Sequence, residues 1–140
     1  MSDIHTKMTF HVTAKRNDSQ SGSAYCKEAS LLIDTNLAGR VDAFNPAELL
    51  LAALSACMIK SIERVTPILK FQLRGVEVEL KGIRQDSPPK MESIYYIIRV
   101  DTDETDHRLA LLHDNVKKFG TVFNTVVTGT VLAGELIRKV

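Results

Sequence analysis

The stretch Asn45-Pro46-Ala47-Glu48-Leu49-Leu50-Leu51-Ala52-Ala53-Leu54-Ser55-Ala56-Cys57-Met58-Ile59 decides the fold of this chain. It opens as a helix, because Asn45 can cap, Pro46 suits the first helical position and Glu48 stands where a capping box needs an acid. The run that follows is apolar on every side apart from one serine, which is typical of a helix surrounded by other structure. It is too short to cross a bilayer, which takes about 17–25 apolar residues. We therefore predict a buried central helix with Cys57 as the reactive side chain of its apolar run.

The composition is that of an ordinary globular chain of 140 residues, short enough to form one domain over residues 1–140. Its 18 basic and 17 acidic side chains leave a formal net charge of +1 without a basic block, so we expect neither nucleic acid nor a membrane as partner. No apolar signal segment opens the chain, which favours the cytoplasm, where Cys26 and Cys57 would be thiols. The four histidines are scattered and no CxxC, HExxH, P-loop or GxGxxG motif occurs, so we expect no metal and no cofactor.

Alternating apolar positions predict strands both before and after the central helix in the sequence. These strands are expected at residues 7–15, 25–34, 76–81, 92–101 and 130–138, with a polar turn at 17–23 and a bulge after Gly82. The central helix should end near residue 65, because the residue before Pro67 resists the helical conformation. Helical spacing predicts further helices at 105–119 and 121–127, separated by Gly120. The mixture indicates an α+β fold whose antiparallel sheet packs on the central helix.

Residues 45–57 resemble the first signature of the OsmC/Ohr family, whose members resist organic hydroperoxides. That signature has a Pro-Glu or Pro-x-Glu start, an apolar helix and an Ala-Cys or Gly-Cys. Gly75-Val76-Glu77-Val78 and the Pro-Pro-Lys turn at 88–90 are also similar to the family. Lys118-Phe119-Gly120-Thr121-Val122-Phe123-Asn124-Thr125-Val126 falls where the family has its second motif, in an altered form. The resemblance covers nearly the whole chain.

The resemblance implies an OsmC-like α+β fold and an intertwined homodimer with long helices packed between two curved sheets. It also implies that Cys57 is the peroxidatic thiol, which attacks the O–O bond and becomes a sulfenic acid. A second-motif cysteine then resolves it, and a dithiol, often on a lipoylated protein, reduces the disulfide. By position, Arg16 is the first match and Arg40 the second for the arginine that stabilises the thiolate. Glu48 is the match for the family's glutamate.

The second motif departs from the family at the resolving position, where Gly120 replaces cysteine. The sulfenic acid of Cys57 then has no usual partner, and Cys26 is the one other thiol in the sequence. Phe123 also replaces a small or polar residue, and its ring would fill the peroxide pocket. If the chain is a peroxidase, the missing second-motif cysteine predicts that reduction needs an external thiol.

The first motif departs at its carboxylate. Ala47 follows the proline, and Glu48 comes one position later. Nine residues separate Glu48 from Cys57, and at about 100° per residue this places them on opposite sides of a helix. We therefore interpret Glu48 as a helix cap rather than as a catalytic residue. Arg16 lies in a polar stretch, where an arginine is usually a solvated charge rather than a stabiliser of a thiolate.

Three functions remain open from the sequence. In the first, the chain is a one-Cys reductase of organic hydroperoxides, with Cys57 as nucleophile. In the second, it is a non-catalytic protein of the same fold that binds an apolar or thiol-containing small molecule at the dimer interface, in a pocket lined by Cys57, Met58, Phe123 and Gly120. In the third, it has a structural role without a ligand, since a buried cysteine is not itself evidence of chemistry.

Overall fold

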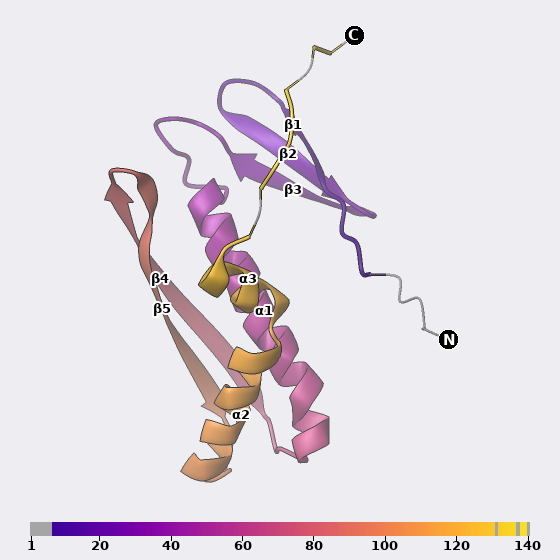
Figure 1. Ribbon diagram of the computed structural model, residues 1–140, viewed down its shortest axis with the longest axis vertical. Helices are drawn as coiled ribbons and strands as arrows, with labels where there is room; N and C mark the ends of the chain where they lie inside the picture. The colour runs from indigo at the N-terminus through magenta and orange to yellow at the C-terminus, as the bar shows by residue number, and fades with distance from the viewer. Residues whose placement is uncertain (1–6, 131, 137, 140) are drawn as a thin grey trace. The chain divides into compact units, whose positions relative to one another are not determined.

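The structure is a computed structural model that describes residues 7–130, 132–136 and 138–139 (Figure 1). Its contacts divide the chain into two compact units, the N-terminal unit Met1–Leu49 and the C-terminal unit Leu50–Val140. A single domain over residues 1–140 therefore stays a prediction. Among the described residues, no helix combines the length and the apolar character that crossing a membrane requires.

The N-terminal unit is a three-stranded antiparallel sheet in the order β1-β2-β3. Its strands are β1 (Thr13–Arg16), β2 (Ser21–Cys26) and β3 (Ala29–Asp34). The turn before β2 is held by Asp18, whose Oδ1 accepts the backbone N–H of Gln20 at 2.8 Å and of Ser21 at 3.0 Å. These hydrogen bonds stabilise the carboxylate and lower the pKa of Asp18.

Three predictions for this unit were wrong in their bounds. The strand expected at 7–15 begins only at Thr13; Met8 and Phe10 are 82% and 75% exposed, and no described strand pairs with residues 7–12. The strand expected at 25–34 is a hairpin, because Lys27 adopts a left-handed φ of 54° and reverses the chain. The turn expected at 17–23 ends earlier, since β2 begins at Ser21 and pairs with both neighbours.

The helix α1 (Pro46–Leu69) begins with the predicted capping box. The backbone N–H of Asn45 donates to Glu48 Oε1 at 2.9 Å, and the N–H of Glu48 donates to Asn45 Oδ1 at 2.8 Å. The end predicted near residue 65 was wrong, since α1 continues through Pro67 to Leu69. The helix stops where Lys70 takes a left-handed φ of 51°.

Within the C-terminal unit, α1 buries one stripe of side chains. Its buried apolar members recur every three or four residues: Leu54, Met58, Ile62 and Val65. Leu50, one turn before Leu54, is 40% exposed, and Ile59, on another face, is 37% exposed. The burial on all sides that the apolar run predicts is therefore not found within the described chain.

A long antiparallel hairpin covers this stripe. It consists of β4 (Gly75–Asp86) and β5 (Pro89–Asp101), and Figure 1 shows it running alongside α1. The register shifts between Ile83 and Arg84, next to the bulge predicted after Gly82. Alternate hairpin side chains pack on the core: Val76, Val78, Leu80, Ile94, Tyr96, Ile98 and Val100.

Two helices follow the hairpin, as predicted. The first is α2 (Asp106–Phe119), whose cap Thr105 accepts the N–H of Arg108 at 3.3 Å, and the second is α3 (Thr121–Thr128). The closing strand expected at 130–138 was wrong for the residues described there, which lie in no strand; positions 131 and 137 of that prediction lie outside the described residues.

The ends of α1 and α2 are tied together by Arg108 and Glu104. Arg108 donates from Nη2 to the Leu69 carbonyl at 2.6 Å and from Nε to Glu104 Oε1 at 2.8 Å. Glu104 Oε2 accepts the backbone N–H of Gln72 at 2.7 Å. The Gln72 N–H, and after it the Arg108 side chain, hold the pKa of Glu104 below its ordinary value.

This carboxylate makes stability depend on pH. A lowered folded-state pKa contributes stability that is present above the unfolded value, about 4.3, and is lost as the pH falls through the folded value. We expect Glu104→Gln to lower the Tm at pH 7 and the gap from the wild type to shrink on acidification below about pH 4. Differential scanning calorimetry across pH measures this, with the exposed Glu92→Gln as control. A gap that is constant with pH would contradict the assignment.

Candidate functional site

Cys57 lies in the middle of α1 as a free, half-buried thiol beside the buried stripe. Its Sγ faces the backbone where α2 gives way to α3. A Cβ built on Gly120 would lie 2.9 Å from Cys57 Sγ and 3.1 Å from the Cβ of Phe123. The structure therefore brings together three residues, Cys57, Gly120 and Phe123, which the sequence predicts to share a site.

Gly120 is buried and is both the C-cap of α2 and the N-cap of α3. Its φ of −76° and ψ of 120° are open to any residue. Glycine fits this position because it has no side chain: a Cβ would lie too close to the sulfur of Cys57. The absence of a side chain leaves the thiol in direct contact with the backbone at the helix junction.

Phe123 is the first of three aromatic rings that contact one another in a row. The rings of Phe123 and Tyr96 meet edge to face, with centroids 6.2 Å apart, and Tyr96 meets His113 in the same way at 5.7 Å. A hydrogen bond of 2.6 Å joins Tyr96 Oη and His113 Nε2. Burial raises the pKa of the Tyr96 hydroxyl, which keeps it protonated at neutral pH.

Reasoning from the sequence assigned no role to Tyr96 and His113. Seventeen positions separate them, one on β5 and one on α2, so no spacing rule connects them. The one available signal was the phase of each element. Tyr96 shares the core-facing phase of β5 with Ile94 and Ile98, and His113 stands about one helical turn before Val116, which is buried on α2.

Two other predicted site residues, Met58 and Glu48, have structural roles in α1. The Met58 side chain is 0% exposed and belongs to the core cluster of α1. Both capping hydrogen bonds of α1 engage Glu48, which confirms its predicted position as a cap. A role for either residue toward a ligand stays a prediction.

A model of the family described as OsmC-like protein matches residues 39–133, more than half of the chain. The chain belongs to the OsmC-like protein family. The matched span includes Arg40, Glu48, Cys57 and Gly120, whereas Arg16 lies before it. A search of curated protein sequences finds no match.

Solved structures share the fold of this OsmC-like protein. An OsmC-like protein from Mycoplasma pneumoniae superposes with a TM-score of 0.80 at 18% identity, covering 89% of this chain and 91% of that one. The organic hydroperoxide resistance protein OsmC from Legionella pneumophila gives 0.63 at 20% identity, covering 88% and 93%. The organic hydroperoxide resistance protein OhrB of Bacillus subtilis gives 0.58 at 19% identity, covering 87% and 93%. At these identities the likeness establishes the α+β fold.

The candidate arginines of the OsmC-like protein both lie in the N-terminal unit. Arg16 ends β1 with an exposed side chain. Arg40 is paired with Asp42, to which it donates from Nε at 2.8 Å and from Nη2 at 2.9 Å. Cys57 belongs to the C-terminal unit. Among the described residues, no cluster of histidine, cysteine or acidic side chains could hold a metal ion.

Proposed function

We propose that this protein reduces organic hydroperoxides through Cys57 in a one-Cys cycle, as a homodimer. The observation that carries the proposal is the contact of the half-buried Cys57 sulfur with the second-motif backbone at Gly120. The nucleophile position and the resolving position of the family thus meet in this chain, although the second thiol is missing. Relatives with the same fold are named organic hydroperoxide resistance proteins in Legionella pneumophila and Bacillus subtilis.

The chemistry balances with one thiol in the chain and two from outside. The Cys57 thiolate attacks the terminal oxygen of ROOH, the O–O bond breaks, and the alkoxide takes a proton to leave as ROH. The sulfur is oxidised to a sulfenic acid. An external thiol attacks this sulfur and releases water, and a second external thiol displaces Cys57 from the mixed disulfide. In the cytoplasm, the compartment we expect, small thiols can serve as this reductant.

The homodimer is supported by the uneven burial of α1. Leu50, two helical turns before Cys57, and Ile59, two residues after it, remain 40% and 37% exposed on α1. Unburied apolar side chains at this density favour contact with a second copy. In such a dimer the arginine that stabilises the thiolate can come from either chain, with Arg16 as first candidate and Arg40 as second.

The test is oxidation of a chain that carries one thiol. In Cys26→Ser, cumene hydroperoxide should add one oxygen to Cys57, and dimedone should trap the sulfenic acid, as followed by mass spectrometry of the intact chain and its peptides. Glutathione should then restore the thiol and support turnover. Cys57→Ser keeps Cys26 and is the matched control, in which turnover should be lost. If Cys57 reacts no faster than Cys26, the proposal fails.

A specific observation favours a second function, binding without catalysis. Glu48 is engaged by both hydrogen bonds of the capping box, and no thiol stands at position 120. In this alternative an apolar or thiol-containing small molecule occupies the Cys57 site. Absence of oxidation at Cys57, together with a small molecule that copurifies with the wild type and is lost from Cys57→Phe, would favour it.

A further inference from the structure

The C-terminal unit contains a hollow between β5 and α2. Its volume is about 370 Å³, within the range of about 300–1,000 Å³ that small-molecule sites occupy. Its floor is the core itself, since Ile62, Leu112 and Val116 line it and are at most 2% exposed. This floor is close-packed and fixed, so the hollow does not depend on the position of mobile surface side chains.

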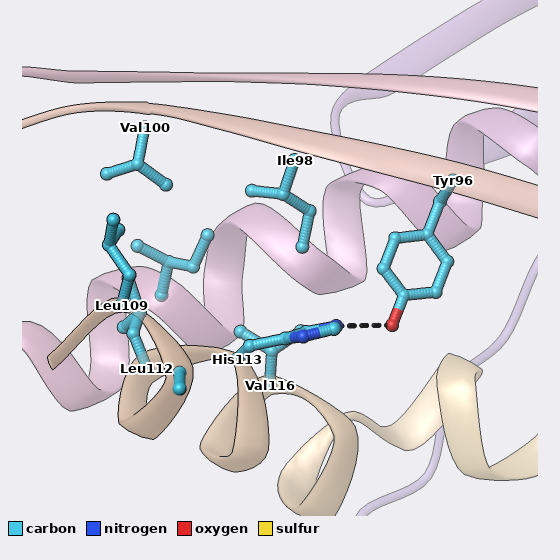
Figure 2. A pocket seen from close by; sticks show the side chains of 9 residues that line it. Tyr96, Ile98, Val100, Leu109, Leu112, His113 and Val116 are labelled. Carbon is cyan, nitrogen blue, oxygen red and sulfur yellow. Dashed lines mark hydrogen bonds between the residues drawn. The ribbon is translucent and has the colours of Figure 1, made fainter. Parts of the chain in front are cut away.

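The polar groups of the hollow are a single pair. Figure 2 shows Tyr96 projecting from β5 and His113 from α2 toward one another, with Ile98 and Val100 following along the strand. The Tyr96 hydroxyl and His113 Nε2 are joined by the 2.6 Å hydrogen bond. None of the described lining residues is a lysine, arginine, aspartate or glutamate. The hollow therefore offers an apolar surface and one hydroxyl–imidazole pair.

We propose that this hollow, the Tyr96–His113 cavity, binds an uncharged apolar molecule that carries one hydroxyl or carbonyl group. Its apolar body lies against Ile98, Val100 and Leu112, and its polar atom hydrogen-bonds to the Tyr96–His113 pair. A hydroxyl already engaged with an imidazole can still accept or donate one further hydrogen bond. The paired arrangement polarises that second bond and gives the cavity a preference for a ligand with a matching polar atom.

The cavity is separate from the thiol site, although the two are neighbours. Its described lining includes neither Cys57 nor Gly120, while the Tyr96 ring borders both the cavity and Phe123. Binding in the cavity therefore requires no reaction at sulfur. We expect Cys57→Ser to bind the same ligands as the wild type, so this inference stands or fails independently of peroxide reduction.

The experiment uses three probes that share a phenyl ring and a short chain: 2-phenylethanol, ethylbenzene and phenylacetate. Each is titrated at pH 8 into the full chain carrying Cys57→Ser, with methyl NMR of isoleucine, leucine and valine as readout. We expect saturable shifts at Ile98, Val100 and Val116. The alcohol should bind about fivefold more tightly than ethylbenzene, the value of one hydrogen bond of about 1 kcal/mol. The phenylacetate anion should bind most weakly, because no charged lining residue offsets its desolvation.

Two variants locate the binding. Tyr96→Phe keeps the ring and removes the hydroxyl, so the preference for alcohol over ethylbenzene should fall from about fivefold to about one, while ethylbenzene binding persists. Ala110→Leu introduces bulk at the exposed rim on α2 and should weaken both neutral probes at least about tenfold. Ala53→Leu makes the same change at an exposed position of α1 outside the cavity and should leave binding unchanged.

Three results would overturn the inference. The first is the absence of saturable shifts at the cavity methyl groups with either neutral probe. The second is an equal preference for the alcohol in Tyr96→Phe and in the parent chain. The third is that Ala110→Leu changes the oligomeric state, measured by light scattering, and leaves probe binding intact, which would assign the hollow to contact with a second copy.

Discussion

Replacing Gly120 with cysteine is expected to create a disulfide with Cys57. A Cβ at position 120 would lie 2.9 Å from Cys57 Sγ. Across a disulfide, the S–S bond of about 2.04 Å places each sulfur about 3 Å from the opposite Cβ, so the two positions are already at bonding distance. The bond would close a loop of about 60 residues and stabilise the oxidised chain by about 2–4 kcal/mol.

Gly120→Cys is made in a Cys26→Ser chain so that one pairing is available. Mass spectrometry under non-reducing conditions should show the loss of both thiols, and urea unfolding with and without a dithiol should show the stabilisation. Gly75→Cys is the matched control, because its Cβ would have Asp101 Cβ as its nearest neighbour at 4.0 Å and no sulfur in contact. Free thiols that persist in Gly120→Cys under mild oxidation would contradict the geometry.

The same variant connects the geometry to the proposed cycle. If the Cys57 sulfenic acid forms as proposed, the thiol introduced by Gly120→Cys should attack it faster than dimedone, so the trapped adduct should disappear. A dithiol should then support turnover better than glutathione, because it reduces an internal disulfide in one encounter. A disulfide that forms under oxidation but never after hydroperoxide would retain the geometry and reject the peroxidase function.

Truncation of Ile62 should produce the largest loss of stability along α1. Its side chain is 0% exposed, and Ile62→Ala is expected to lower the free energy of unfolding by about 2–5 kcal/mol through lost burial and the enlarged void. Ile68 is the matched control, with the same side chain 75% exposed on the same helix. Ile68→Ala should change stability by at most about 0.5 kcal/mol. Urea unfolding compares the two.

Equal losses in the two isoleucine variants would contradict this assignment of the buried face. The α1 stripe would then be insufficient to describe what the helix buries in solution. Unfolding at several protein concentrations distinguishes the causes, since stability that rises with concentration indicates burial against a second copy.

Elements with strong local signals were predicted well from the sequence. Asn45, Pro46 and Glu48 mark the start of α1, and the structure shows the expected reciprocal hydrogen bonds. The helical spacing before Gly120 predicts α2, and the alternation around Gly82 predicts the hairpin. In each case the residues that decide the structure are neighbours in sequence, so their types and spacing are enough.

Elements that depend on distant partners were not predicted. α1 continues beyond Pro67 and finds a partner for its last carbonyl on Arg108, 39 positions further along the chain. The β2–β3 reversal at Lys27 uses a left-handed residue that is neither glycine nor asparagine, so the turn carries no sequence signal. Ser21 and Gly22 resemble loop residues and become a strand because Ser21 pairs with β3 and Gly22 pairs with both β1 and β3.

The candidate site divides in the same way. The family motifs pointed to Cys57, Gly120 and Phe123. In the structure, a Cβ built on Gly120 would contact both the Cys57 sulfur and the Cβ of Phe123. The Tyr96–His113 pair arises from the register of β5 against α2, a tertiary relation that neither element encodes alone. The family motifs include Cys57 but neither Tyr96 nor His113.

The contact between Cys57 and Gly120 also bears on how easily such a chain changes its chemistry over generations. Some glycine codons become cysteine codons by a change of the first base alone. The Cys57 sulfur already lies 2.9 Å from a Cβ at position 120, so that point mutation would ask for little more than a small shift of Phe123, whose Cβ would be 3.1 Å away. If Cys57 is oxidised as proposed, resolution by an internal cysteine and resolution by an external thiol differ by one codon change on this scaffold, and a lineage could move between them as its supply of reducing partners changes.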